Sequence, residues 1–67
     1  MKDHYLIENK DRYFDVEEDT FVDYDNHGVP MYGLGELEQL IANDPGRFRG
    51  CYIVDCLNNF EIVKETE

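Results

Sequence analysis

Apolar and polar residues alternate near the start of the chain, which is the pattern of half-buried β-strands. Residues 5–9 are rich in β-prone side chains, residues 9–12 are polar, and residues 13–17 alternate apolar with acidic side chains. Two such segments on either side of a short polar stretch predict a β-hairpin.

A further β-prone stretch follows over residues 20–24. The Glu18-Asp19 pair before it is compatible with a turn or a bulge between two separate strands. One long bent strand over residues 13–24 also fits the pattern. The sequence alone leaves both arrangements open.

One amphipathic helix is expected in the middle of the chain. Its apolar positions recur at i, i+3, i+6 and i+7 and so share one face: Leu34, Leu37, Leu40 and Ile41. Gly33 or Gly35 can serve as the N-cap. The helix must end near Asn43, because the residue before Pro45 is steered away from α geometry.

The last part of the chain predicts a second hairpin, with strands over residues 51–56 and 60–64. A three-residue turn with Asn59 at positive φ places Cys56 opposite Phe60. In this register the apolar side chains share one face of the hairpin: Tyr52, Val54, Cys56, Phe60 and Ile62.

These elements predict an α+β fold, in which an antiparallel sheet of four or five strands carries one amphipathic helix, in the order ββ(β)αββ. We expect the helix to cover the apolar face of the second hairpin, and the other sheet face to be left to water or to a partner. The contacts are expected among Leu37, Leu40, Ile41, Val54, Phe60 and Ile62. A chain of 67 residues is expected to form a single domain, over residues 1–67.

The charge of the chain narrows the choice of partners. Sixteen Asp and Glu residues against six Lys and Arg give a net charge of −10 at pH 7. Nucleic acid and anionic membranes would be repelled as direct ligands, whereas a basic protein would be attracted. The sequence has neither an apolar run long enough to cross a membrane nor an apolar N-terminal stretch typical of a signal peptide. We therefore expect a cytoplasmic protein.

An acidic run is the feature most suggestive of function. Between Asp15 and Asp25, six of eleven residues are acidic and none is Lys or Arg. On a strand, alternate acidic side chains would project from one face about 6.6 Å apart, which is of the order of the step between successive phosphates in a nucleic acid. The run could thus occupy a Lys/Arg groove, with an aromatic anchor at its edge. The candidate partner-binding residues are Asp15, Glu17, Glu18, Asp19, Asp23, Tyr24 and Asp25.

The alternative interpretation of this run is a solvated strand face. Such charge keeps a small protein soluble and protects an exposed sheet edge from unwanted pairing.

Catalytic groups are scarce. The chain has no serine, which excludes a serine nucleophile. Cys51 and Cys56 have no neighbouring cluster of positive charge or helix N-terminus to lower the pKa of their thiols. Five residues apart on an extended strand, they would also be too far apart to form a disulfide. We expect no enzymatic activity and two reduced thiols.

Metal binding finds little support. The segment that begins at Asp23 matches a calcium loop at positions one, three and six, but Leu34 stands where the closing Glu belongs. The histidines and cysteines lack the close spacings of structural zinc sites: His4, His27, Cys51 and Cys56. No cofactor is expected.

In its length, its charge and its acidic run, the chain resembles the small single-domain inhibitors that bacteriophages and mobile elements encode, among them anti-CRISPR proteins and nucleic-acid mimics. The resemblance implies a stoichiometric action, in which the protein occupies a basic surface of a host enzyme and excludes its nucleic acid. No residue role is carried over from those proteins.

The leading hypothesis is accordingly a non-enzymatic inhibitor whose acidic face docks on a basic, nucleic-acid-binding protein. Two alternatives stay open. One is a structural or adaptor domain that forms a homodimer through an open sheet face, and the other is a small-ligand or metal-binding module.

Overall fold

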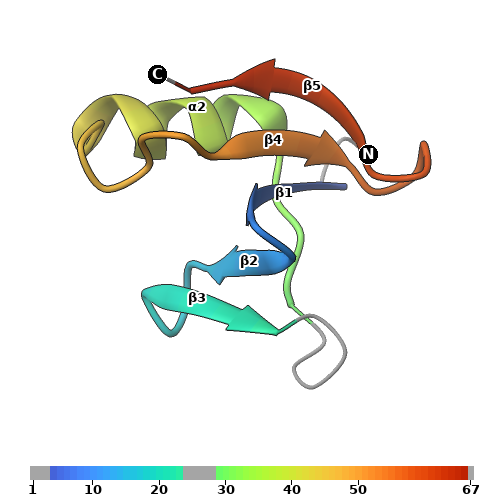
Figure 1. Ribbon diagram of the computed structural model, residues 1–67, viewed down its shortest axis with the longest axis horizontal. Coiled ribbons are helices and arrows are strands. Elements are labelled where there is room, and N and C mark those ends of the chain that lie inside the picture. Colours follow the sequence, from blue (N-terminus) through green and yellow to red (C-terminus); the bar gives the residue numbers. More distant parts are fainter. Residues whose placement is uncertain (1–3, 24–28, 67) are drawn as a thin grey trace.

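A five-stranded antiparallel sheet and one helix make up the fold (Figure 1). The computed structural model describes residues 4–23 and 29–66. The predicted α+β class and the element order are confirmed, with the third strand present. The elements are β1 (Tyr5–Asn9), β2 (Arg12–Asp15), β3 (Thr20–Asp23), α2 (Leu34–Asn43), β4 (Tyr52–Asp55) and β5 (Glu61–Glu65).

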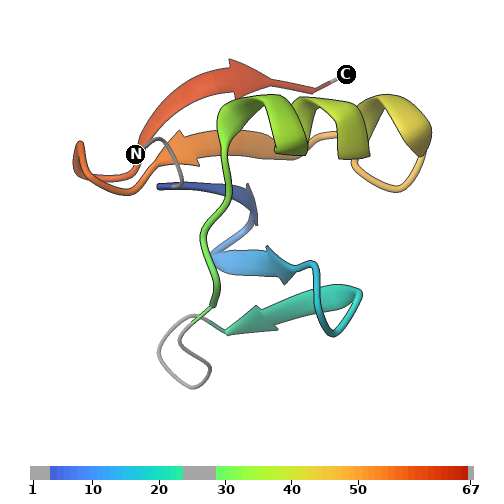
Figure 2. The ribbon, with the colours of Figure 1, turned by 180° about the vertical axis from the view of Figure 1, so that it is seen from behind.

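The strand order in space is β3-β2-β1-β4-β5, so β3 and β5 form the two edges of the sheet. Helix α2 runs alongside β4, and the β2–β3 hairpin projects away from it, as the front and back views show (Figures 1 and 2). The segment that precedes the helix passes β1 on its way from the β3 side of the sheet to α2 (Figure 2). The two predicted hairpins therefore lie side by side, with β1 and β4 as the central pair.

The β1–β2 connection is the predicted tight turn. Lys10 and Asp11 both have positive φ, at 52° and 70°, and Asn9 pairs with Arg12. Two left-handed residues in a two-residue loop are typical of a type I′ turn, whose twist matches that of the flanking strands.

The β2–β3 connection decides between the two arrangements left open by the sequence. Strand β2 ends at Asp15, residues 16–19 form a turn, and Asp15 pairs with Thr20. A turn between two strands is therefore correct, and one long strand over residues 13–24 is wrong. The described part of β3 ends at Asp23.

Helix α2 spans the predicted residues. Gly33 is its N-cap, in extended geometry, and its N–H donates to Glu36 Oε1 over 3.0 Å. This is half of a capping box, since glycine has no side chain with which to complete it. At the other end the N–H of Asp44 donates to the carbonyl of Ile41, and the helix stops before Pro45 as expected.

The prediction that the helix packs on the sheet face of Val54, Phe60 and Ile62 is wrong. Leu37 is the helix residue buried in the core, at 2% exposure, and Leu40 and Ile41 are only partly buried beside it. The core on the helix side contains Ile7, Phe14, Leu37, Phe48, Cys51 and Ile53. Strand alternation puts Ile53 on the opposite face from Val54, so the helix covers the odd-numbered residues of β4 rather than the even-numbered ones.

The second sheet face is not open, contrary to expectation. A second cluster of buried side chains lies there: Leu6, Val22, Val29 and Val54. Partly buried residues pack around it, among them Met31 from the segment before the helix and Phe60 from the β4–β5 loop. Both faces of the sheet are thus apolar and covered at the central strands β1 and β4. The sequence pattern of β4, which is apolar at Tyr52, Ile53 and Val54 in succession, is typical of such a strand.

Next to the turn, the second hairpin keeps the predicted register, with Val54 opposite Ile62 and with Asn59 at a φ of 56°. Further along, Ile53 pairs with Lys64, one residue later on β5 than predicted. Phe60 is also left-handed, so β5 starts one residue later than expected. A register shift occurs beside Ile53 and Val54. Ile62, which was expected in the core, is 47% exposed on this edge strand.

The cysteines lie on opposite faces of the sheet. Cys51 belongs to the cluster beneath the helix, whereas Cys56 packs against the cluster on the other face. Both are free thiols. We predict that the mass spectrum of the native protein is the same with and without reductant. An oxidised form lighter by about two mass units, which a single disulfide requires, would contradict this arrangement.

Candidate functional site

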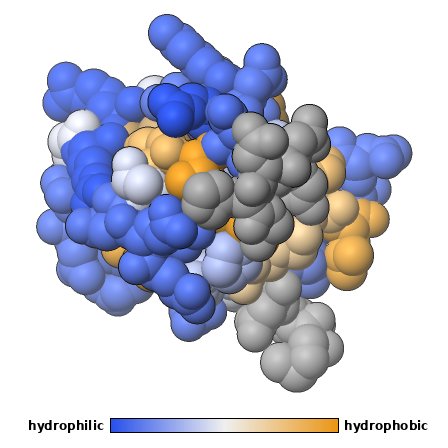
Figure 3. Space-filling model, turned by 90° about the horizontal axis from the view of Figure 1, so that it is seen from below, coloured by the Kyte–Doolittle hydropathy of each residue, from blue (hydrophilic) through white to orange (hydrophobic). Residues whose placement is uncertain are grey.

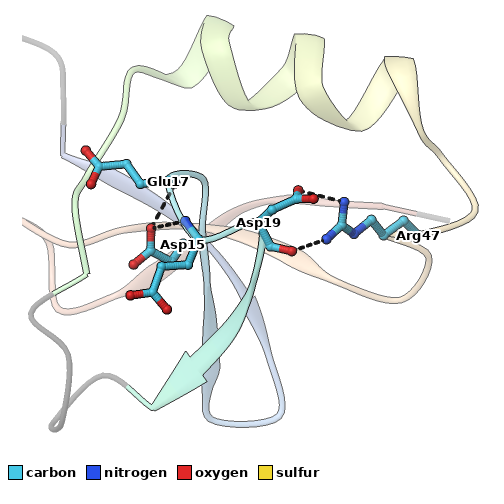
Figure 4. A network of polar contacts seen from close by, with 5 residues as sticks. Asp15, Glu17, Asp19 and Arg47 are labelled. Atoms are coloured by element: carbon cyan, nitrogen blue, oxygen red, sulfur yellow. Dashed lines mark hydrogen bonds and ion pairs between the residues drawn. The ribbon is translucent and has the colours of Figure 1, made fainter.

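The acidic run is organised around the loop between β2 and β3, which we call the acidic turn (residues 15–19). Asp15 is buried, at 4% exposure, whereas Glu17, Glu18 and Asp19 are exposed. Figure 4 shows Glu17 and Asp19 on either side of Asp15. The predicted row of carboxylates on one strand face is therefore wrong, because these residues belong to a turn and not to a strand.

Asp15 builds the turn instead of facing a partner. Its Oδ1 accepts hydrogen bonds from the backbone N–H groups of Glu17 and Glu18, over 2.9 Å and 3.2 Å (Figure 4). Aspartate readily offers the backbone such an alternative to a strand ladder, and this explains why β2 stops at Asp15. Asp15 is thus removed from the candidate partner-binding residues.

Arg47 fastens the other side of the turn. Its Nη1 lies 2.9 Å from Asp19 Oδ1, and its Nη2 donates to the backbone carbonyl of Asp19. Its guanidinium also lies over the ring of Phe14, 4.8 Å from the ring centroid. Asp19 has a φ of 61°, a conformation that aspartate tolerates better than most residues. The ion pair is exposed, so its contribution to stability is small, but it partly neutralises Asp19.

The remaining predicted residues divide into two groups. Glu17 and Glu18 are exposed residues of the turn itself. Asp23 lies at the far end of β3, where its Oδ1 is 3.5 Å from Nε of Arg12. Tyr24 and Asp25 lie outside the described residues. The structure therefore brings Glu17, Glu18 and Asp19 together, but it does not bring Asp23 to them.

Replacing Asp15 by alanine tests its structural role. The variant leaves the two N–H groups of the turn without their acceptor, which should cost about 1–3 kcal/mol of unfolding free energy. Glu17→Gln, at an exposed site next to it, should change stability by no more than about 0.5 kcal/mol. Urea unfolding measures both. Equal stability of the two variants would show that Asp15 does not hold the turn.

A groove of about 520 Å³ lies beside the acidic turn. Its apolar lining includes Val16 of the turn, Tyr32 from the segment before the helix, and Leu37 and Leu40 of α2. Burial raises the pKa of the Tyr32 hydroxyl, and the nearby carboxylates of Glu17, Asp15 and Glu36 raise it further. Sequence reasoning missed this groove because its walls come from three separate segments, whose proximity no local pattern encodes.

The thiols are poor nucleophiles. Burial raises the pKa of the Cys51 thiol. Burial and the neighbouring carboxylate of Asp55 raise the pKa of the Cys56 thiol to about 11. A raised pKa reduces the fraction of reactive thiolate at neutral pH.

The raised pKa of Cys56 predicts a loss of stability in base. A thiol in the unfolded chain has a pKa of about 8.5, so the folded state holds this proton more tightly. The resulting stability is complete below about pH 8.5 and is lost as the pH rises towards about 11, the folded pKa. Between these two pH values, the melting temperature should therefore fall less steeply with rising pH for Cys56→Ala than for the natural chain. Parallel curves would contradict the shift.

His4 makes a polar contact with Asp55 that the sequence did not indicate. Its Nδ1 lies 2.8 Å from Oδ1 of Asp55, and its ring stacks on Tyr5 with 4.3 Å between centroids. The contact links residues 51 positions apart, at the place where the start of β1 pairs with the end of β4. His27 and most of the expected calcium-like loop lie outside the described residues.

Within residues 4–23 and 29–66, no group of three or more His, Cys, Asp or Glu side chains is placed to hold a metal ion. Over the same residues, no helix has the length and the apolar character needed to cross a membrane. No family model matches the chain, and no curated protein or solved structure matches it either.

Proposed function

We propose that this protein is a non-enzymatic acidic binding protein, which inhibits a nucleic-acid-binding protein by occupying its basic surface. The observation that carries the proposal is the acidic turn: Glu17 and Glu18 are exposed on a loop that Asp15 and Arg47 hold in place. The net charge of −10 extends the same sign over the rest of the chain.

A fastened turn is well suited to binding. Loops that are ordered before binding lose little conformational entropy on association, so more of the interaction energy appears as affinity. Carboxylates held in this way also attract a basic partner over a distance and speed the encounter. The end of the molecule that carries the acidic turn is mostly hydrophilic, as the view from the β3 side shows (Figure 3).

The expected mechanism is competition for the same basic side chains. Lys and Arg side chains that bind phosphate also bind carboxylate, with the same geometry in the case of Arg. One bound copy of the acidic protein therefore excludes nucleic acid without any covalent chemistry. This action is the one implied by the resemblance to the small inhibitors of phages and mobile elements.

Displacement of nucleic acid tests the proposal. The protein is used to capture binding proteins from its cells of origin, and each captured protein is then given a fluorescent oligonucleotide that it binds. Adding the acidic protein should release the oligonucleotide at about one copy per partner. The double variant E17K/E18K should lose this effect, whereas E61K/E65K, which reverses two exposed glutamates on β5, should keep it. An oligonucleotide that stays bound at saturating acidic protein would overturn the proposal.

A homodimer is the second candidate, and the structure favours a different surface for it than expected. The open sheet face that was expected to mediate it is covered, but the edge strand β5 exposes Ile62 and Val63 by 47% and 46%. Unpaired strand edges with apolar side chains are templates for pairing with another chain. Sedimentation equilibrium decides this case. A dimer that Val63→Lys dissociates supports it, and a monomer at high concentration excludes it.

A further inference from the structure

The groove beside the acidic turn joins two kinds of surface. Its apolar walls are formed by Val16, Tyr32, Leu37 and Leu40. The exposed side chains of Glu36 and Gln39 also line it. Its volume of about 520 Å³ falls within the range of pockets that bind small ligands, and is ample for a large apolar side chain.

The charge around this groove is of one sign. Three carboxylates are close enough to the Tyr32 hydroxyl to act on it, namely those of Glu17, Asp15 and Glu36. Among the described residues, none of those that line the groove is basic. The exposed cation nearest in the fold to the acidic turn, Arg47, is already engaged by Asp19. An anionic ligand would therefore be repelled, whereas a cationic one is complementary.

We propose that the groove receives one apolar side chain from a basic segment of the partner protein, while the flanking Lys or Arg side chains lie on Glu17 and Glu36. This inference rests on the proposed function, because the same basic partner supplies both contacts. The inference also requires that the basic segment of the partner contain an apolar residue, which attraction between charges alone does not require. Buried apolar anchors surrounded by polar contacts are the usual source of affinity in protein interfaces.

Gly35 provides a way to close the groove without disturbing the fold. It lies in the first turn of α2 and lines the groove, and a Cβ added there meets no atom within 4 Å. Gly46 is equally open but lies outside the groove, in the turn after the helix. The substitution Gly35→Phe should therefore fill the groove, and Gly46→Phe is its matched control. Gly35→Ala adds little volume and favours the helix.

The test uses two short synthetic peptides with blocked ends. In one, a leucine is flanked on both sides by lysine pairs, and in the other a glycine replaces the leucine. The leucine peptide should bind the natural protein about tenfold more tightly, as burial of such a side chain allows. Calorimetric titration measures both affinities.

The variants separate this inference from the proposed function. Gly35→Phe should reduce the affinity for the leucine peptide to that of the glycine peptide, whereas Gly46→Phe and Gly35→Ala should leave the preference intact. The inference would be overturned if the natural protein bound the two peptides with equal affinity. It would also be overturned if Gly35→Phe still preferred the leucine peptide. E17K/E18K should lower the affinity for both peptides equally. If this loss is seen but the natural protein shows no preference for leucine, the groove inference fails while the proposed function stands.

Discussion

Replacing Phe48 by alanine is expected to destabilise the protein by about 3–5 kcal/mol, the usual cost of truncating a buried aromatic residue. Phe48 is 1% exposed and packs edge-on against Phe14, with 4.9 Å between ring centroids. Phe21 completes the aromatic group, and its ring centroid lies 6.3 Å from that of Phe48. Small domains have stabilities of roughly 0.05–0.15 kcal/mol per residue, so this loss is comparable with the total stability of the chain.

Urea unfolding followed by circular dichroism measures this loss. Leu57→Ala is the control, because Leu57 is 78% exposed and its truncation should change the unfolding free energy by no more than about 0.5 kcal/mol. If Phe48→Ala leaves no folded protein, Phe48→Leu keeps part of the buried volume and a measurable transition. Similar stabilities for the Phe48 and Leu57 variants would show that the aromatic group is not the core.

The hairpins and the helix could be predicted because local signals specify them. The polar stretch at residues 9–12 and the left-handed Asn59 set two registers, and Pro45 ends the helix. The face on which the helix packs could not be predicted. Three apolar residues in succession, Tyr52 to Val54, offer both faces of β4, and only the tertiary arrangement selects between them.

The candidate site was predicted in part. The acidic run does lie on the surface at Glu17, Glu18 and Asp19, but charge counting assigned Asp15 the same role. Aspartate side chains often accept a hydrogen bond from the backbone two residues further along a turn, so an aspartate just before the polar stretch Glu17–Asp19 could have been identified as the residue that caps the turn. The bond from Arg47 to Asp19 spans 28 positions, and no local pattern encodes it.

Reversing the exposed charges of the acidic turn has the largest effect expected on function. Electrostatic steering raises association rates by about 10–1,000-fold at low salt, and the gain disappears as salt screens the charges. E17K/E18K changes the charge of the turn by four units while leaving Asp15 and the Arg47 contact in place. Association with the basic partner should therefore slow by about tenfold or more at low ionic strength. Its dependence on salt should also become flatter.

E61K/E65K is the matched control, because it changes the net charge equally from exposed positions on β5, at the opposite edge of the sheet from β3. The most direct test is the association rate of the natural chain and of these two variants with the basic partner, measured by surface plasmon resonance over a series of salt concentrations. Binding through the acidic turn predicts that E17K/E18K loses most of the rate and of its salt dependence, and that E61K/E65K loses little. Equal losses for the two variants would mean that net charge alone governs association, and would contradict a docking surface at the acidic turn.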